Sequence, residues 1–317
     1  SNGDGMNRIG FLFPGQGAQY VGMGKDIFEQ SPAGRKVYET ADSLLGYSIS
    51  KICFEGPESE LTRTLYAQTA IFVTSMAAFE AFREKNPGIQ PALTAGLSLG
   101  EFTALTVAES ISFEDALRLI KVRAESMEEA ASQNPGAMAS VLGLEIEKCR
   151  EVARESGCEI ANLNTPEQTV LSGSRESIER ACPIAEAKGA KRVIPLKVGG
   201  AFHSSLMRPA QEKLENALKS TTIHAPKCLF IPNVTAQKVM EPDTIRDLLA
   251  KQLTSSVQWV MTLAAVKSEG IHTCVEMGPG KVLKGLVKKC QPEIKVFNVG
   301  TMSDLAQEDA LRAISNP

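Results

Sequence analysis

Residues 91–105 read PALTAGLSLGEFTAL, which places a G-x-S-x-G run between an apolar stretch and a helix-like one. In a strand-to-helix turn of this kind, the two glycines let the central serine adopt a strained backbone with its hydroxyl exposed. Negative charge that develops there meets unpaired N–H groups and the positive end of the helix dipole. The pattern predicts that Ser98 attacks an acyl carbonyl. The alternative is a glycine-flanked serine in an ordinary turn.

Length and composition are those of a globular protein. The chain has 317 residues, of which 43% are hydrophobic and 22% charged, enough for one large domain or two of ordinary size. A net charge of −3 gives no electrostatic reason to expect nucleic acid or an anionic membrane as partner. No apolar run reaches the roughly 18–20 residues that a spanning helix needs. We therefore expect neither nucleic acid nor a membrane to be a partner.

The seven cysteines are scattered, with no C-x-x-C pair and no Cys/His cluster. This pattern disfavours a disulfide framework and a zinc site, and it fits a reducing compartment. We expect a cytoplasmic protein without a metal. Residues 1–5 precede Met6 and lack an apolar stretch, so we interpret them as a remnant of cloning rather than a signal peptide.

Strands and helices alternate through the first half of the chain, which predicts a mainly parallel sheet flanked by helices. A short buried strand at 8–13 leads into a glycine-rich loop at 14–19. Helical patterns lie near 24–45 and 59–84, and two more follow the G-x-S-x-G run as far as about residue 131. The second pattern predicts one core-facing helix side, formed by Phe72, Met76, Phe79 and Phe82.

Shorter units follow, and their order β-α-β-β-α-β is the ferredoxin-like arrangement. The expected elements are a strand at 137–142, a helix at 145–155, strands at 159–163 and 169–172, a helix at 175–187 and a strand at 192–198. After residue 202 the chain returns to long helices and short apolar strands, at 228–232, 273–277 and 296–299. We therefore expect a small subdomain, residues 134–198, inserted into a large hydrolase-like α/β subdomain formed by residues 6–133 and 199–317.

A serine nucleophile needs a base within hydrogen-bond reach, and the chain has three histidines. His224 lies in an expected loop and His272 begins an apolar strand, so both have ordinary structural explanations. His203 lies where the small subdomain returns to the large one, and clefts form at such junctions. His203 is the best candidate for the base; the alternative is a hydrogen-bonded structural histidine.

Two glycine-rich loops resemble nucleotide-binding motifs but lack required residues. In the loop 15–20, Tyr20 stands where the dinucleotide fingerprint has its third glycine. In the loop 278–281, the glycines are too closely spaced for a phosphate-binding loop, and Val282 replaces its Ser/Thr. We interpret both loops as tight turns at strand ends that line a cleft.

Several motifs occur in a specific order along the chain. They are Phe13-Pro14-Gly15-Gln16-Gly17-Ala18-Gln19, Gln68-Thr69-Ala70, Gly96-Leu97-Ser98-Leu99-Gly100-Glu101-Phe102, Val122-Arg123-Ala124-Glu125-Ser126-Met127, Gly200-Ala201-Phe202-His203 and Val275-Glu276-Met277-Gly278-Pro279-Gly280. In these motifs the chain resembles the malonyl-CoA:acyl carrier protein transacylases of bacterial-type fatty acid synthesis. The resemblance covers essentially the whole chain from Met6 onward.

The resemblance implies roles for the reacting residues. Ser98 matches the family's nucleophile and His203 its general base. Arg123 matches the arginine that binds the malonyl carboxylate, which a planar guanidinium can do through two parallel hydrogen bonds. A buried arginine left unpaired would penalise an acyl group that lacks the carboxylate, such as acetyl. The alternative for Arg123 is an exposed position on a helix surface.

Backbone groups are also implied. The N–H groups of Gln16 and Leu99 would form the oxyanion hole. The main-chain carbonyl of Gln252 would orient the histidine, in place of the usual aspartate. Because only a backbone atom of Gln252 would be used, we expect its side chain to tolerate change.

Four further positions concern the acyl pocket. Phe202 occupies the position that in related domains marks malonyl over methylmalonyl, since a bulky ring leaves little room for a methyl branch. Met127 and Gln68 are expected to line the cleft. The family usually has histidine before the serine, whereas this chain has Leu97; this position is not the base in the implied mechanism, so we expect activity to be kept.

The implied reaction is a ping-pong transfer that supplies fatty acid elongation. Ser98 takes the malonyl group from coenzyme A as an ester, and the phosphopantetheine thiol of acyl carrier protein then accepts it. No metal or bound cofactor is expected. Because carrier proteins are acidic, a basic rim is expected on this protein. The candidates are Lys191, Arg192, Lys281, Lys284, Lys288 and Lys289.

Two other functions are compatible with the G-x-S-x-G run. One is a serine thioesterase or esterase that hydrolyses an acyl-CoA. An α/β-hydrolase orders its residues Ser, acid, His along the chain, and no acidic residue here has motif support. The other is a non-catalytic module that binds a carrier protein.

Overall fold

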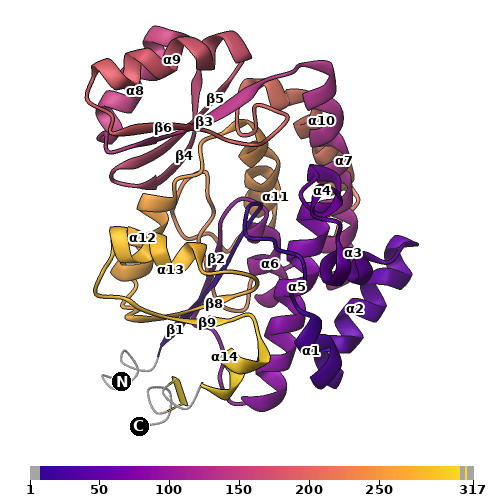
Figure 1. The fold of residues 1–317 in the computed structure, drawn as a ribbon. Coiled ribbons are helices and arrows are strands. Elements are labelled where there is room, and N and C mark those ends of the chain that lie inside the picture. Colours follow the sequence, from indigo (N-terminus) through magenta and orange to yellow (C-terminus); the bar gives the residue numbers. More distant parts are fainter. Residues whose placement is uncertain (1–7, 308–310, 313–317) are drawn as a thin grey trace.

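A computed structural model of the protein describes residues 8–307 together with 311 and 312. Residues 1–5, interpreted above as a remnant of cloning, lie outside the described residues. Figure 1 shows two lobes: a small sheet with two helices on its outer side, and a larger lobe in which helices flank a second sheet. The two sheets are built from different strands and are not joined.

The sheet of the large lobe is parallel throughout, as expected. Its strands are β1 (Ile9–Phe13), β2 (Leu93–Gly96), β7 (Leu229–Phe230), β8 (Thr273–Met277) and β9 (Lys295–Val299), in the order β7-β2-β1-β8-β9. All residues of the central strand β1 are buried, because both faces of a parallel sheet are covered by helices. Since all five strands end at one edge, the loops that follow them meet there.

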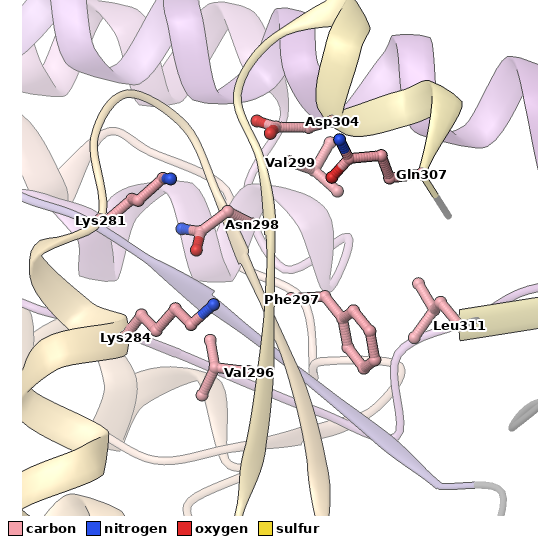
Figure 2. A pocket seen from close by; sticks show the side chains of 9 residues that line it. All are labelled: Lys281, Lys284, Val296, Phe297, Asn298, Val299, Asp304, Gln307 and Leu311. Atoms are coloured by element: carbon pink, nitrogen blue, oxygen red, sulfur yellow. The ribbon is translucent and has the colours of Figure 1, made fainter. Parts of the chain in front are cut away.

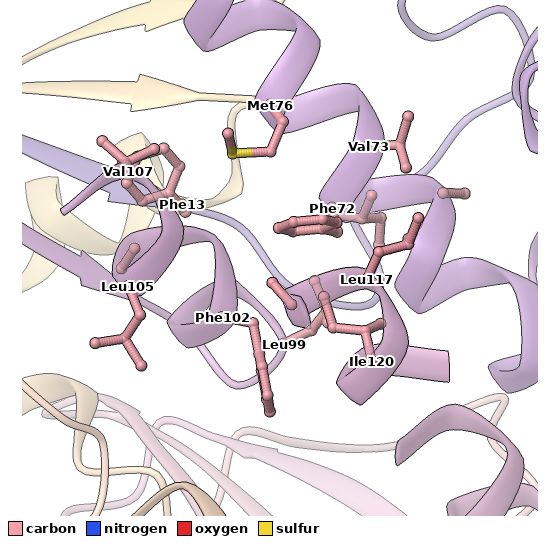
Figure 3. Close-up of a cluster of buried hydrophobic side chains, with 14 of the residues drawn as sticks. Phe13, Phe72, Val73, Met76, Leu99, Phe102, Leu105, Val107, Leu117 and Ile120 are labelled. Carbon is pink, nitrogen blue, oxygen red and sulfur yellow. The ribbon is translucent and has the colours of Figure 1, made fainter. Parts of the chain in front are cut away.

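Alternate residues of β1 belong to two separate hydrophobic clusters, one on each face of the sheet. Ile9, Phe11 and Phe13 belong to the cluster under α5 (Thr64–Lys85) and α6 (Gly100–Val107). Leu12 belongs to the cluster under α12 (Trp259–Ser268) and α13 (Val282–Cys290). Figure 3 shows Phe13 beside Val107 of α6; Leu99 of the Ser98 turn and Phe72 of α5 belong to the same cluster. The Ser98 turn therefore rests on the core of the large lobe.

The remaining helices of the large lobe surround this core. They are α1 (Lys25–Gln30), α2 (Pro32–Leu45), α3 (Ile49–Glu55), α4 (Glu58–Leu61), α7 (Phe113–Gln133), α10 (Arg208–Lys219), α11 (Pro242–Lys251) and α14 (Met302–Ala306), with short 3₁₀ turns η2 (Ser205–Met207) and η3 (Gln252–Thr254). Within the described part of the chain, no helix is both long enough and apolar enough to cross a membrane.

Two expectations about the helices were wrong. The pattern at 24–45 forms two helices, because Ser31 caps α2 by accepting from the N–H of Gly34 and Pro32 occupies its first turn. Helix α5 has Phe72, Met76, Phe79 and Phe82 buried as expected, but it is buried on nearly every side rather than on one. It lies between α2 and α7 and also contacts α6 and β8, so no face of its middle turns reaches solvent.

The small lobe has the expected ferredoxin-like order. Its elements are β3 (Ala137–Leu142), α8 (Ile146–Ser156), β4 (Glu159–Thr165), β5 (Gln168–Gly173), α9 (Arg175–Ala187) and β6 (Arg192–Pro195). The strands pair antiparallel in the order β4-β5-β3-β6 and share a separate hydrophobic cluster with α8 and α9. Strand β6 ends three residues earlier than expected, at Pro195. We propose residues 134–198 as the extent of this subdomain.

The turn between β2 and α6 holds Ser98 at a φ of 54°, in the left-handed region. The next glycine, Gly100, lies against the end of β1: a Cβ built on it would be 2.1 Å from the carbonyl oxygen of Phe13. Only a residue without a side chain lets the turn approach the central strand this closely. The second glycine of the G-x-S-x-G run is thus a requirement of the fold.

We predict that Gly100→Ala lowers the free energy of unfolding by about 1–3 kcal/mol, because the added methyl forces the turn away from β1. Urea denaturation measures the change. Gly285→Ala is the matched control: it lies within α13 with no atom within 4 Å of the added methyl, so it should stabilise by about 0.5–1 kcal/mol. Equal destabilisation by both substitutions would contradict the steric explanation.

Candidate active site

Ser98 and His203 lie in hydrogen-bond contact although they are far apart in sequence. Ser98 Oγ is 2.8 Å from His203 Nε2, and His203 Nδ1 is 2.8 Å from the carbonyl oxygen of Gln252. A carbonyl can only accept, so Nδ1 carries the ring hydrogen and Nε2 is free to accept from the serine hydroxyl. This is the tautomer that a general base requires.

Burial keeps the imidazole neutral. His203 is 5% exposed, and its pKa is lowered from 6.5 to about 4, first by burial and then by the positive charge of Arg123; hydrogen bonds to the backbone of Gln252 and Ser255 partly oppose the shift. The backbone of His203 is also left-handed, at a φ of 58°. His224 and His272 are both exposed, in the loop after α10 and just before β8. The structure therefore brings only His203, of the three histidines, to the serine.

Arg123 lies on α7 and is 1% exposed, so the alternative of an exposed helix arginine is wrong. Its Nη2 donates to Ser98 Oγ at 3.2 Å and to Gln252 Oε1 at 2.7 Å, and its Nη1 donates to Gln68 Oε1 at 2.6 Å. Burial lowers the pKa of the guanidinium to about 10, while the Glu101 carboxylate raises it, so Arg123 stays charged at neutral pH. A fixed positive charge thus lies beside Ser98 Oγ.

The side chain of Gln252 takes part in the site, which corrects the expectation that only its main chain is used. Its Oε1 accepts from Arg123, and its Nε2 donates to the carbonyl of Ser98 at 3.0 Å and to Glu101 Oε2 at 2.9 Å. The carbonyl of the same residue accepts from His203. Because Gln252 is fully buried, replacing its side chain would leave these partners unpaired.

Gln68 and Met127 lie together beside Arg123. Gln68, on α5, accepts from Arg123 through Oε1, and its Nε2 contacts the sulfur of Met127 at 3.3 Å. Met127 follows Arg123 by one helical turn on α7. Gln68 thus contacts the guanidinium of Arg123, and Met127 contacts Gln68.

The loop after β1 approaches the turn around Ser98 from its other side. A Cβ built on Gly15 would lie 2.3 Å from the carbonyl oxygen of Leu97 and 3.5 Å from the nitrogen of Leu99. Within the described residues, the N–H groups of Gln16 and Leu99 have no protein acceptor. The side chain of Gln16 is directed to Thr64, to which its Nε2 donates at 3.3 Å. Two free backbone donors therefore belong to neighbouring turns beside the nucleophile.

Phe202 and Leu97 differ in their surroundings. Phe202 is buried in the hydrophobic cluster that also holds Met127 and Leu99. Leu97, which stands where the family usually has histidine, is half-buried against the other cluster, beneath α12 and α13. The departure from the family pattern is thus accommodated by apolar packing on the far face of the sheet.

Two buried polar residues of the site, Asn233 and Glu101, were not among the predicted ones. Asn233 follows β7 at the same sheet edge as Ser98 and contacts its backbone: Oδ1 accepts from the Ser98 N–H at 2.7 Å. Glu101 Oε2 accepts from the Asn233 N–H at 3.1 Å. Burial raises the pKa of Glu101 to about 7, against the lowering effects of Asn233, Gln252 and Arg123. Asn233 comes directly after the strand expected at 228–232, and this position could have indicated that it lies at the sheet edge near Ser98.

One hollow of the large lobe lies away from these residues. A hollow of about 270 Å³ lies along β9 between α13 and α14 and is lined by Lys281, Lys284 and Asp304, among others (Figure 2). It includes neither Ser98 nor Arg123. Among residues 8–307, 311 and 312, no group of three or more His, Cys, Asp or Glu is arranged to hold a metal ion.

A serine hydroxyl in hydrogen-bond contact with both a neutral histidine and a buried arginine is the arrangement expected of a serine acyl-transfer site. The chain belongs to the acyl transferase domain family, whose sequence profile matches residues 10–310. The family resemblance seen in the sequence motifs is thereby confirmed.

Individual relatives agree with this assignment. The chain is 44% identical to the malonyl CoA-acyl carrier protein transacylase of Bacillus subtilis (strain 168), over 93% of this chain and 94% of that protein. It is similar to the acyl-carrier-protein S-malonyltransferase of Burkholderia pseudomallei 1710b, with a TM-score of 0.92 at 38% identity over 96% of this chain and 99% of that one. A malonyl-transacylase in complex with a type II PKS acyl-carrier protein matches with a TM-score of 0.91 at 35% identity, over 96% and 99%.

We predict that the reaction of Ser98 with a fluorophosphonate keeps its neutral-pH rate down to about pH 5 and then falls, with a midpoint near the His203 pKa of about 4. Only the neutral imidazole can accept the serine proton. Arg123→Met removes a nearby positive charge, so the midpoint should move up toward 6.5, the ordinary histidine value. Labelling rates measured from about pH 3.5 to 8 give both midpoints.

The unfolded chain protonates this imidazole more readily than the folded one. Part of the stability of the wild type should therefore be lost as pH falls from about 6.5 toward 4. A labelling midpoint near 6.5 in both proteins would show that neither burial nor Arg123 sets the protonation of His203.

Proposed function

We propose that this chain transfers a malonyl group from coenzyme A to the phosphopantetheine thiol of acyl carrier protein, through an ester on Ser98. The observation that carries the proposal is the Arg123 guanidinium, which is buried, charged and 3.2 Å from Ser98 Oγ. An apolar acyl group would leave this charge unpaired, whereas a malonyl carboxylate supplies its counter-ion. The transfer would supply fatty acid elongation.

In the first half-reaction, His203 Nε2 takes the hydroxyl proton as Ser98 Oγ attacks the thioester carbonyl. The imidazolium that forms donates through Nδ1 to the carbonyl of Gln252, which stabilises it without a buried aspartate. Negative charge on the carbonyl oxygen is stabilised by the N–H groups of Gln16 and Leu99. The tetrahedral intermediate then collapses, and His203 returns the proton to the departing thiolate of coenzyme A.

The second half-reaction repeats these steps in reverse. His203 takes the proton of the carrier's phosphopantetheine thiol, the sulfur attacks the malonyl ester, and Ser98 Oγ leaves with the proton from His203. All the proton transfers use this one imidazole, so the reaction as proposed needs no metal and no bound cofactor.

Acyl selection is assigned to the residues around Arg123. The carboxylate of the malonyl group would accept from the guanidinium, whose orientation Gln68 and Gln252 fix by accepting from Nη1 and Nη2. Met127 would line the cleft beyond Gln68. Phe202 would limit the space at the α-carbon and so disfavour a methyl branch, an effect of about 1–3 kcal/mol.

Acyl carrier protein is the proposed partner because the structural relative described above is a complex with such a protein. Lys281 and Lys284, two of the candidate basic residues, line the hollow along β9. The relatives do not favour the alternatives of a hydrolase or a non-catalytic carrier-binding module. The cytoplasmic location expected from the cysteine pattern stays a prediction.

We predict that mixing the protein with malonyl-CoA adds one malonyl group to Ser98, detected as an increase in intact protein mass, and that added carrier protein removes it. Ser98→Ala should gain no mass, and acetyl-CoA should label the wild type poorly. Arg123→Ala should reduce the malonyl-over-acetyl preference by about 10- to 150-fold, which corresponds to the loss of a charged hydrogen bond worth about 1.5–3 kcal/mol.

Three results would contradict the proposal. The first is an unchanged malonyl preference in Arg123→Ala, which would remove the role given to the guanidinium. The second is labelling at a residue other than Ser98. The third is release of malonate to water faster than transfer to the carrier, which would favour a hydrolase.

A further inference from the structure

The backbone of Ser98 has to be held in place by its surroundings. Its φ of 54° is in the left-handed region, which residues with a side chain rarely adopt. Its carbonyl accepts from the N–H of Glu101 at 3.0 Å at the start of α6, but its own N–H has no backbone acceptor within the described residues. A group outside the turn must therefore determine where the hydroxyl points.

That group is the side chain of Asn233. Its Oδ1 accepts from the N–H of Ser98 at 2.7 Å, and its Nδ2 donates to the carbonyl of Gly96 at 2.7 Å. One amide thus binds the backbone on both sides of Leu97. Both distances are short for neutral hydrogen bonds of this kind, and Asn233 is fully buried, so water cannot replace it.

Asn233 is itself fixed by its neighbours. Its N–H donates to Glu101 Oε2 at 3.1 Å, and its carbonyl accepts from the N–H of Gln258 at 2.9 Å. Glu101 Oε2 also accepts from Gln252 Nε2, and this nitrogen lies 3.0 Å from the Ser98 carbonyl. The N–H and the C=O of Ser98 are therefore bound by two buried amides that share one carboxylate oxygen.

We propose that Asn233 is a positioning residue for the nucleophile, holding Ser98 in its left-handed conformation so that Oγ meets His203 Nε2. Asn233 touches no reacting atom; it acts through the backbone of Ser98. Glu101 supports it by fixing the Asn233 backbone. The assignment rests on the proposed function only in the choice of malonyl-CoA as one of the two test reagents.

The test compares the wild type with Asn233→Ala and Asn233→Asp. Pre-steady-state mixing with malonyl-CoA gives the rate constant of ester formation and the concentration that gives half the maximal rate. A fluorophosphonate gives the reactivity of Ser98 toward a reagent that has no carboxylate for Arg123 and no carrier. Rate constants, unlike amplitudes, do not depend on how much of a variant is folded, so a poorly folding variant still gives an answer.

For Asn233→Ala, both rate constants should fall about 10- to 100-fold, because a displacement of the hydroxyl by an ångström misaligns attack. The half-saturating malonyl-CoA concentration should change less than about two-fold, since the substrate contacts are kept. Asn233→Asp retains an acceptor for the Ser98 N–H but not the donor to Gly96, so its rate constants should fall between those of the wild type and Asn233→Ala.

Asn298→Ala is the matched control. Asn298 lies on β9, where its Nδ2 donates to Glu276 Oε1 at 2.9 Å and to the carbonyl of Gly280 at 3.3 Å. It binds a loop at the same sheet edge but does not contact Ser98, so its loss should lower stability and leave both rate constants within about two-fold.

Wild-type rate constants in Asn233→Ala, or an equal fall in Asn298→Ala, would overturn the proposal. A wild type that reacts with the fluorophosphonate but not with malonyl-CoA would contradict the proposed function and leave the role of Asn233 to be decided by the fluorophosphonate rates alone. Failure of the wild type to react with either reagent would contradict both.

Discussion

The positive charge of Arg123, buried beside the Ser98 hydroxyl, is the constraint around which the site is built. Burying a guanidinium is costly unless its donors are satisfied. Here two glutamine side chains and the serine hydroxyl accept from Nη1 and Nη2, while Nε has no partner within the described chain. The nearest acidic group, Glu101, is joined to it only through the amide of Gln252. The charge is thus held in place but not neutralised by direct contact with a carboxylate.

This arrangement has consequences for each reacting group. The positive charge helps to keep His203 neutral, and therefore able to accept a proton, at pH values where an ordinary histidine would be protonated. It also leaves a favourable position for an anionic acyl group. Gln252 couples the two effects, because its side chain holds Arg123 and its carbonyl orients His203. A shift of this one residue would disturb both the guanidinium and the imidazole.

Much of this could be predicted from the sequence where the signal is local. The Ser98 turn is marked by Gly100, which the close approach to β1 requires. The six elements of the small lobe follow local hydrophobic patterns, and their ends were placed to within three residues. The break at Ser31 was missed because a serine followed by proline interrupts a helix without interrupting its apolar pattern. The nearly complete burial of α5 was missed because it depends on neighbours from both sides, which periodicity does not report.

The polar contacts of the site could not be predicted from local sequence patterns either. The motifs predict that Ser98, His203 and Arg123 are functional residues, but they do not predict which side-chain atoms are in contact. The contacts of Gln252 and Asn233 with Ser98 join residues 154 and 135 positions apart, respectively, and no local pattern distinguishes such a residue from any other buried amide. Asn233 is placed by the sheet, which brings the ends of β2 and β7 to one edge, and Gln252 is placed by η3, which follows α11.

A crystal structure of the malonyl ester of Ser98 would test most directly whether the buried charge organises the site. The account predicts that the malonyl carboxylate accepts two hydrogen bonds from Arg123, and that the ester carbonyl oxygen lies within about 3.1 Å of the N–H groups of Gln16 and Leu99. A carboxylate directed to solvent, with Arg123 still bound to Ser98 Oγ and the glutamines as in the free protein, would contradict it.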